Sequence, residues 1–361
     1  MNPKTFSYIF RIVLLLSLLY LFFVSIALMS ASIKMFGKGF AEQLLATTSS
    51  PFVGLFIGIL ATSLVQSSST TTSMTVALVA SGAIELQGAI PIIMGANVGT
   101  SVTNTLVALA HITRAGEFKK AFAAATMHDF FNLIAIIVLF PLNYVTNVLE
   151  ILAKFLSGLF QAAGGLKFAN PLKMATAPAV DLIKQIVSAS GWIMLIIAVV
   201  FLLISLRYIV VTLKALVIGR VETFFNETLF KNAFRSFVIG LILTVMVQSS
   251  SITTSLAVPL ASTGIFSLRQ IFPYTLGANI GTTITAILAS MVTANPIAVA
   301  TAFAHLMFNM LGIILIWPVK EFPIWLAEKL ADLAIKNRLI PLVYIVCVFF
   351  IIPVTFIFFL R

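Results

Sequence analysis

Two short runs of serine, threonine and glutamine interrupt otherwise apolar stretches of the sequence. The first is residues 66–73 (QSSSTTTS) and the second is residues 248–255 (QSSSITTS). Hydroxyl and amide groups can donate hydrogen bonds to an oxyanion and offer oxygen atoms to a cation. A membrane helix that breaks at such a run also exposes N–H groups and the positive end of its dipole, which favour an anion. We therefore interpret both runs as candidate binding segments.

A second motif accompanies each run at a fixed distance. Residues 95–100 (GANVGT) and 277–282 (GANIGT) lie 182 residues apart, as do Gln66 and Gln248. Aligning residues 58–107 on 240–289 gives 22 identities in 50 positions without a gap. Small residues are also common at helix contacts in membranes, which is the alternative interpretation of these motifs. Shared hydrophobic composition, however, would not place glutamine, asparagine and proline at the same positions in both halves. The chain therefore contains an internal duplication.

The composition indicates a membrane protein. Of 361 residues, 60% are hydrophobic and 9% are charged, whereas a soluble domain carries roughly 25% charged residues. The net charge of +11 is best explained by basic loops on the cytoplasmic side, not by a nucleic-acid surface. The single cysteine, Cys347, excludes an intrachain disulfide. We interpret the first apolar run as a retained membrane helix rather than a signal peptide.

Apolar runs of about 20 residues predict three membrane helices in each half of the chain and one more at the end. Shorter apolar pieces flank each QSSS run, which predicts a re-entrant hairpin around 52–80 and another around 237–262. The predicted organisation is a first repeat (1–161), a connector (162–189), a second repeat (190–335) and a C-terminal membrane helix (339–361). Three spans per repeat would invert the second copy. Basic residues in the loop after the first GAN segment, but none at 291–296, agree with inversion.

The predicted fold class is thus an all-α polytopic membrane protein. It has two inverted-topology repeats, each with a re-entrant QSSS helical hairpin and broken membrane helices, a plan typical of secondary transporters. In the GAN segments, Asn97 and Asn279 need partners because an unpaired amide in lipid is costly. Carbonyl groups beside a glycine break could also bind a cation.

Two polar residues recur in a later apolar helix of each half. His128 and Asn132 have the spacing of His305 and Asn309, which places each pair on one helix face. We interpret these four as scaffold residues, because no carboxylate or cysteine set accompanies them for a metal site. Asp129 has no acidic counterpart in the second copy, where the residue is leucine. An acid within a membrane helix indicates function, here cation binding or protonation; the alternative is capping or an ion pair with a loop lysine such as Lys119.

At these residues the sequence resembles the type II sodium-dependent phosphate cotransporter family. The resemblance is carried by QSSS at 66–69 and 248–251, PIIMGANVGTSVTNT at 91–105 and HDFFN at 128–132. It covers roughly residues 50–142 and 232–318, and the long disulfide-bonded loop of animal members is absent, as in a compact bacterial member. The resemblance implies electrogenic, sodium-coupled uptake of inorganic phosphate, with substrate held between the two QSSS hairpins near mid-membrane and alternating access.

The resemblance also assigns site residues. Phosphate would bind at Gln66, Ser67, Ser68, Ser69, Gln248, Ser249, Ser250 and Ser251. Sodium would bind among Ser68, Thr71, Asn97, Thr100, Asp129, Ser250, Thr253, Thr254, Asn279 and Thr282. The expected partners are phosphate, sodium as the only coupling ion and the lipid bilayer of the cell membrane, with no further cofactor and no nucleic acid; a homodimer is compatible with the sequence.

Other carriers, channels and enzymes are the alternative functions. A sodium- or proton-coupled carrier of another small oxyanion or of a carboxylate would share this architecture. An arginine clamp would favour carboxylates, but Arg114, Arg235 and Arg269 all fall in predicted loops. Channels usually assemble from simple spans around one axis. An enzyme would need a nucleophile with a base, and no such pairing accompanies the serines.

Overall fold

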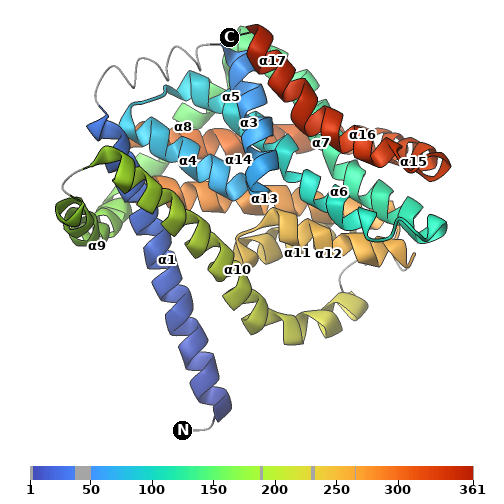
Figure 1. Ribbon diagram of the computed structural model, residues 1–361, viewed down its shortest axis with the longest axis horizontal. Coiled ribbons are helices and arrows are strands. Elements are labelled where there is room, and N and C mark those ends of the chain that lie inside the picture. The colour runs from blue at the N-terminus through green and yellow to red at the C-terminus, as the bar shows by residue number, and fades with distance from the viewer. Residues whose placement is uncertain (1–2, 37–49, 188–189, 229–231, 265, 361) are drawn as a thin grey trace.

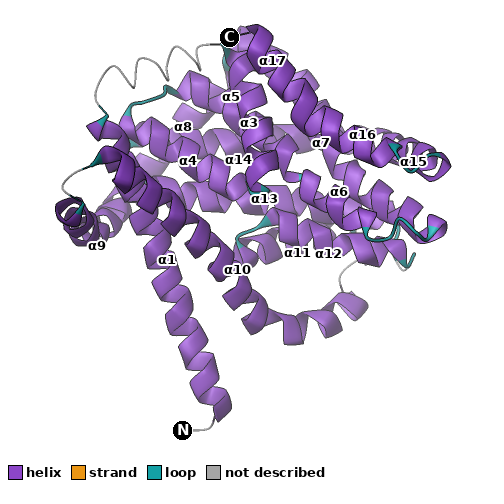
Figure 2. Ribbon diagram, viewed as in Figure 1, coloured by secondary structure: helices purple, strands orange, loops and turns teal. Residues whose placement is uncertain are grey.

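The computed structural model describes residues 3–36, 50–187, 190–228, 232–264 and 266–360, and every regular element in these ranges is a helix (Figures 1 and 2). In chain order they are α1 (Pro3–Met35), α3 (Pro51–Val65), α4 (Ser68–Ser81), α5 (Leu86–Thr100), α6 (Val102–Leu109), α7 (Ala115–Thr146), α8 (Val148–Ala162), α9 (Gly165–Ile186), α10 (Gly191–Thr228), α11 (Ala233–Val247), α12 (Ser250–Ser262), α13 (Leu268–Thr293), α14 (Pro296–Ile316), η1 (Trp317–Val319), α15 (Glu321–Lys336), α16 (Ile340–Val346), η2 (Cys347–Ile351) and α17 (Ile352–Leu360).

Seven segments in the described part of the chain are long and apolar enough to cross a membrane. Three precede the connector, three follow it and one ends the chain: Ile9–Met35, Leu86–Leu109, Ala115–Thr146, Gly191–Ile209, Leu268–Thr293, Pro296–Val319 and Ile340–Leu360. The predicted all-helical, multi-pass membrane fold is confirmed. The predicted connector contains the helix α9, which packs against α1 and α13.

The helices end where the QSSS runs predict a break. Gln66 and Gln248 terminate α3 and α11 in the left-handed region, with φ of 55° and 54°. The next helix starts at Ser68 or Ser250. Thr62 Oγ1 donates to Thr71 Oγ1 at 2.8 Å, although residues nine apart in a straight helix are separated by about 13 Å. The chain therefore turns back at Gln66–Ser67, called here the first break; Gln248–Ser249 is the second break.

Glycine allows an equivalent backbone contact in each copy, the first being residues 50–142 and the second 232–318. A Cβ atom on Gly58 would overlap the carbonyl oxygen of Ile92, and one on Gly240 would overlap that of Tyr274. The GAN glycines face the same contacts, where α5 packs on α3 and α13 on α11. Close approach through small residues is a common basis of helix association in membranes.

The expected interruption at the GAN segments is absent. Residues 95–100 lie inside α5 and residues 277–282 inside α13, which is continuous to Thr293. Only the first copy has an interruption nearby, at Ser101 between α5 and α6. The glycines allow close contact between helices, and the backbone around them stays helical.

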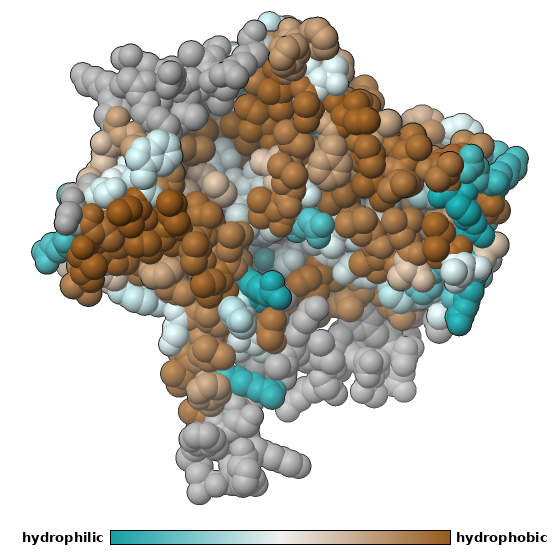
Figure 3. Space-filling model, viewed as in Figure 1, coloured by the Kyte–Doolittle hydropathy of each residue, from teal (hydrophilic) through white to brown (hydrophobic). Residues whose placement is uncertain are grey.

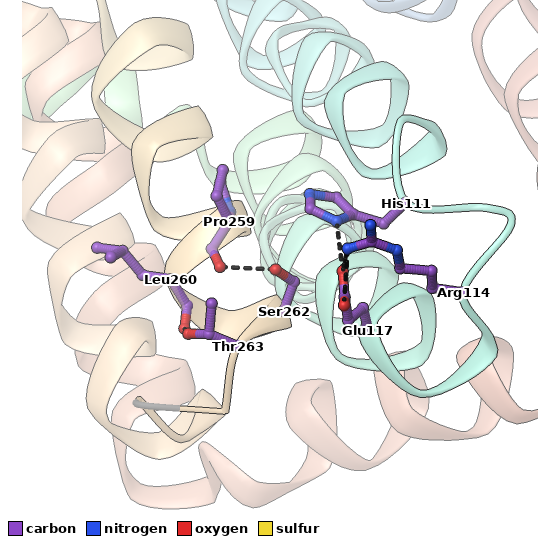
Figure 4. A network of polar contacts seen from close by, with 7 residues as sticks. All are labelled: His111, Arg114, Glu117, Pro259, Leu260, Ser262 and Thr263. Carbon is purple, nitrogen blue, oxygen red and sulfur yellow. Dashed lines mark hydrogen bonds and ion pairs between the residues drawn. The ribbon is translucent and has the colours of Figure 1, made fainter.

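The two copies interlock instead of packing as separate domains. Helix α7 of the first copy contacts α12 and α13 of the second, and α14 of the second contacts α4, α5 and α7 of the first (Figure 1). At the α6–α7 connection, Glu117 accepts hydrogen bonds from Arg114 at 3.1 Å and 3.3 Å and contacts His111 at 3.4 Å, beside the end of α12 (Figure 4). The interlocking brings both breaks toward the same part of the molecule.

Candidate functional site at the two helix breaks

Each break forms the start of a helix that is capped by the second residue of its QSSS run. Ser67 Oγ accepts from the Thr70 N–H at 3.2 Å, and Ser249 Oγ accepts from the Ile252 N–H at 3.4 Å. The N–H groups of the next two serines in each run precede the first bonds within their helix. Both helix starts therefore present donors and a partial positive charge at the break.

The two breaks meet across the molecule. Ser69 Oγ donates to the backbone oxygen of Gln248 at 3.4 Å, which joins the first break to the second. Between them and α10 lies a cavity of about 510 Å³, lined by Val65, Ser67, Thr70, Leu203, Leu206, Arg207, Val211, Gln248, Ser249 and Ile252. Hydrophilic residues gather in a hollow beside α10 on an otherwise largely hydrophobic face (Figure 3).

The predicted phosphate residues fall into three groups: cavity-lining, buried and exposed. Ser67, Gln248 and Ser249 line the cavity. The four serines that follow in the two runs are buried, with exposed fractions of 3% to 6%; these are Ser68, Ser69, Ser250 and Ser251. Gln66 is exposed and does not line the cavity, whereas the amide oxygen of Gln248 accepts from Thr285 at 2.7 Å.

The predicted sodium residues are buried oxygen-bearing side chains, but most hydroxyls already donate to a carbonyl one helical turn earlier. Thr100 donates to Ala96 O at 2.9 Å and Thr282 to Ala278 O at 3.0 Å. The remaining threonines among them behave similarly or contact another hydroxyl; these are Thr71, Thr253 and Thr254. Their oxygen lone pairs remain available to a hard cation.

The two histidines join the copies. His128 Nε2 lies 2.6 Å from Asn279 Oδ1, and His305 Nε2 lies 3.3 Å from Asn97 Oδ1. Each histidine thus pairs with the GAN asparagine of the other copy. Asn132 receives a hydrogen bond from Asn279 at 3.2 Å, and Asn309 donates to the carbonyl of His305 at 3.0 Å. All these side chains are buried. Asn97, Asn132 and Asn279 are paired within the protein, whereas Asn309 Oδ1 has no hydrogen-bond partner among the described residues.

Asp129 lies fully buried on α7. Its Oδ2 accepts from Tyr344 Oη at 2.9 Å and from Thr105 Oγ1 at 3.4 Å, while its Oδ1 has no hydrogen-bond partner among the described residues. Lys119, the loop lysine that the sequence offered as an alternative partner, pairs with Asp332 instead. The acid is therefore held by neutral hydroxyl groups.

Sequence reasoning missed several residues around the site. Arg207 lines the cavity from α10, and its position inside the apolar run 192–211 was the available signal. Asn104 accepts from Thr254 of the second copy at 2.9 Å, and its amide lies 3.5 Å from His128. Nothing in the sequence links Tyr344 to Asp129. No group of three or more histidine, cysteine or acidic residues suited to a metal ion occurs among the residues described.

Comparison with known proteins identifies the family. The family model described as Na+/Pi-cotransporter matches residues 21–168 and 201–321. Human sodium-dependent phosphate transport protein 2B is 32% identical over 97% of this chain, and the sheep protein 2A is 32% identical over 95%. The chain spans about two thirds of these relatives, 65% and 66% of their lengths. No solved structure gives a significant match. The chain belongs to the Na+/Pi-cotransporter family.

Proposed function

We propose that this protein is a secondary active transporter that couples the uptake of inorganic phosphate to sodium, with net movement of charge. The observation that carries the proposal is the cavity at which both helix breaks meet. It combines serine hydroxyls, an amide and one charged side chain, Arg207, and no acid occurs among its described lining residues. The family and the names of its relatives support the choice of phosphate and sodium.

The cavity suits a small tetrahedral anion. Phosphate has oxygens in four directions, and the two helix starts approach from different elements with hydroxyl and N–H donors. Ser67, Ser249 and Gln248 act through side chains, and the serines behind them through backbone N–H groups. Gln66 completes the set when its side chain turns inward. A carboxylate carrier would also be expected to use an arginine, and Arg207 lines the cavity, so competition by succinate is the test that distinguishes the two ligands.

Sodium binds, in this proposal, at buried oxygens beside the cavity. A hard cation prefers oxygen ligands, and the threonine hydroxyls near the breaks supply them. Asp129 adds the negative charge, so that a sodium ion at this residue is neutralised by the protein and not by phosphate. The asparagine–histidine pairs hold the two copies together while the cavity opens alternately to each side of the cell membrane.

Uptake into proteoliposomes tests the proposal. Purified protein is supplied with labelled phosphate under an inward gradient of sodium, of protons or of neither, with sulfate, arsenate and succinate as competitors. We expect uptake that requires sodium and is inhibited by arsenate alone. Ser67→Ala and Ser249→Ala should each raise the phosphate KM, whereas Ser262→Ala, at the far end of α12, should not. Uptake driven by protons, or inhibited by sulfate or succinate, would contradict the assigned ion or substrate.

A further inference from the structure

The C-terminal membrane segment, residues 340–360, lies outside the duplicated part of the chain, yet it reaches the buried acid of the first copy. Tyr344, on α16, donates to Asp129 Oδ2 at 2.9 Å across 215 residues of sequence. Further along, α17 packs against α3, where Phe56 and Phe356 stack with centroids 4.6 Å apart. The segment is thus anchored on the helix that ends at the first break.

The two oxygens of Asp129 have different surroundings. Oδ2 receives the Tyr344 hydroxyl and, at 3.4 Å, that of Thr105. Oδ1 is buried without a partner among the described residues, and the hydroxyl of Ser101 lies beside the carboxyl group. A buried carboxylate oxygen without a partner is costly. A cation that bound at Oδ1 would satisfy it without displacing either donor from Oδ2.

Aromatic packing fixes where the Tyr344 hydroxyl points. Its ring lies 6.5 Å from that of Phe122, 6.5 Å from that of Phe130 and 6.1 Å from that of Phe349. The first two belong to α7, the helix that carries Asp129. With the ring held on that helix, the hydroxyl can hold the carboxylate in one orientation.

We propose that Tyr344 is a positioning residue for sodium at Asp129: it holds Oδ2 so that Oδ1 stays directed at the incoming cation. The inference rests on the proposed function, because it takes sodium as the coupling ion. Tyr344 makes the shorter of the two hydrogen bonds to Oδ2, 2.9 Å against 3.4 Å for Thr105, so its loss leaves the carboxylate free to rotate away from the binding orientation. We expect Tyr344→Phe to weaken sodium binding about tenfold, equivalent to ~1.4 kcal/mol, which is within the range for hydrogen bonds to charged groups.

Sodium-dependent thermal stability tests the proposal without requiring transport. The melting temperature of the full chain in detergent is measured against sodium concentration, without phosphate, with choline keeping ionic strength constant. We expect the half-saturating sodium concentration to rise about tenfold in Tyr344→Phe. Tyr20→Phe is the matched control, because Tyr20 donates to Ala175 O at 3.0 Å far from Asp129 in the fold. It should keep the wild-type sodium midpoint.

A double-mutant cycle separates positioning from packing. Asp129→Gly should weaken the sodium response, and adding Tyr344→Phe should shift it no further, because the tyrosine acts through the acid. An unchanged midpoint in Tyr344→Phe, the same shift in the Asp129→Gly background, or a wild-type protein that sodium does not stabilise would each overturn the inference. A wild type that sodium stabilises but that takes up no phosphate would instead contradict the proposed function, while a Tyr344→Phe shift in it would still support cation positioning.

Discussion

The two breaks have the same backbone conformation but differ in the charged side chains near them. Each break has a glutamine in the left-handed region, a serine cap on the next helix and a glycine contact behind it. Only the first copy has an acid on the following long helix; the second has Leu306 at the position of Asp129. The duplicated residues thus give both breaks the same backbone geometry, and a residue that was not duplicated, Asp129, gives the two copies different charges.

A smaller difference concerns the glutamines. Thr285 donates to Gln248 at 2.7 Å, whereas Thr103, its counterpart in the first copy, has a buried hydroxyl without a partner among the described residues, and Gln66 is exposed. The same residues therefore adopt two arrangements in one structure. A transporter that exchanges the roles of its two halves would need both arrangements to be accessible.

The helix contact that both copies share can be disrupted at its glycines, where we expect the largest effect on stability. Gly58→Ala and Gly240→Ala each place a Cβ atom against a backbone carbonyl oxygen, which should cost about 3 kcal/mol in each copy. The melting temperature of each variant measures this loss. Gly158→Ala is the control: its Cβ has open space in α8, and alanine should stabilise the helix by up to about 1 kcal/mol. A wild-type melting temperature for either contact variant would contradict the symmetric packing.

The asymmetric charge can be removed at Asp129. Asp129→Gly should abolish net charge movement in proteoliposomes and leave some phosphate uptake, because it removes the carboxylate that we propose accompanies one sodium ion. Current and labelled uptake are measured on the same preparation. Leu306→Gly is the control, because it also replaces a larger side chain by glycine at the equivalent position of the second copy but removes no charge. It should retain the current per phosphate. Currents unchanged in Asp129→Gly would rule out this residue as a sodium ligand.

The breaks and spans could be predicted from the sequence because they depend on local signals. Glutamine and serine within an apolar run, repeated at one offset, located both breaks, and hydropathy located the seven spans within a few residues. The contacts that complete the site depend on which helices pack together. His128 and Asn132 have a visible spacing, but His128 meets Asn279, which is 151 residues away. No local pattern could indicate that partner.

The GAN segments illustrate a different limit. Glycine permits both a helix break and a close helix contact, and the sequence alone does not distinguish them. The structure has the contact, because the carbonyl groups of Leu55 and Phe237 occupy the space where a side chain on Gly95 or Gly277 would lie. The breaks at glutamine required no such choice, since the serine that follows can cap a new helix.

Arg207 extends the comparison to substrate binding, because the described lining of the cavity contains no other charged side chain. Arg207→Gln should raise the phosphate KM about tenfold, or ~1.4 kcal/mol, with a smaller effect on maximal rate. Arg207→Lys should recover much of the loss, and added salt should reduce the difference between wild type and Arg207→Gln. Arg235→Gln, at the start of α11, is the control. A phosphate KM equal to wild type would remove Arg207 from the binding site.

The different surroundings of Gln66 and Gln248 predict a smaller effect on stability, and in the second copy alone. Thr285→Val removes the donor to Gln248 and should cost about 1 kcal/mol. Thr103→Val replaces a buried hydroxyl that lacks a partner and should be neutral or stabilising. Melting temperatures of the two variants, measured side by side without substrate, check the difference. Equal losses would show that Thr103 and Gln66 pair as Thr285 and Gln248 do.

The smallest effect concerns an ion pair that ties the first copy to the helix after the second. Lys119 contacts Asp332 on α15, with 44% and 39% of the side chains exposed. The hydrogen bond from Lys119 lowers the pKa of Asp332. A lowered pKa in the folded state means that the pair stabilises the fold above about pH 4 and that this contribution is lost as the pH falls through the lowered value.

The melting temperatures of wild type and Lys119→Met should therefore differ by a small, constant amount between pH 8 and pH 5, and converge in more acidic buffer. The analogous pair of Arg269 with Glu321, which also lowers the pKa of that glutamate, joins two elements on the second-copy side. Arg269→Met should show the same pH dependence. If only Lys119→Met altered phosphate uptake at neutral pH, the pair between α7 and α15 would have a role in relative movement of the copies, which a purely surface ion pair does not have.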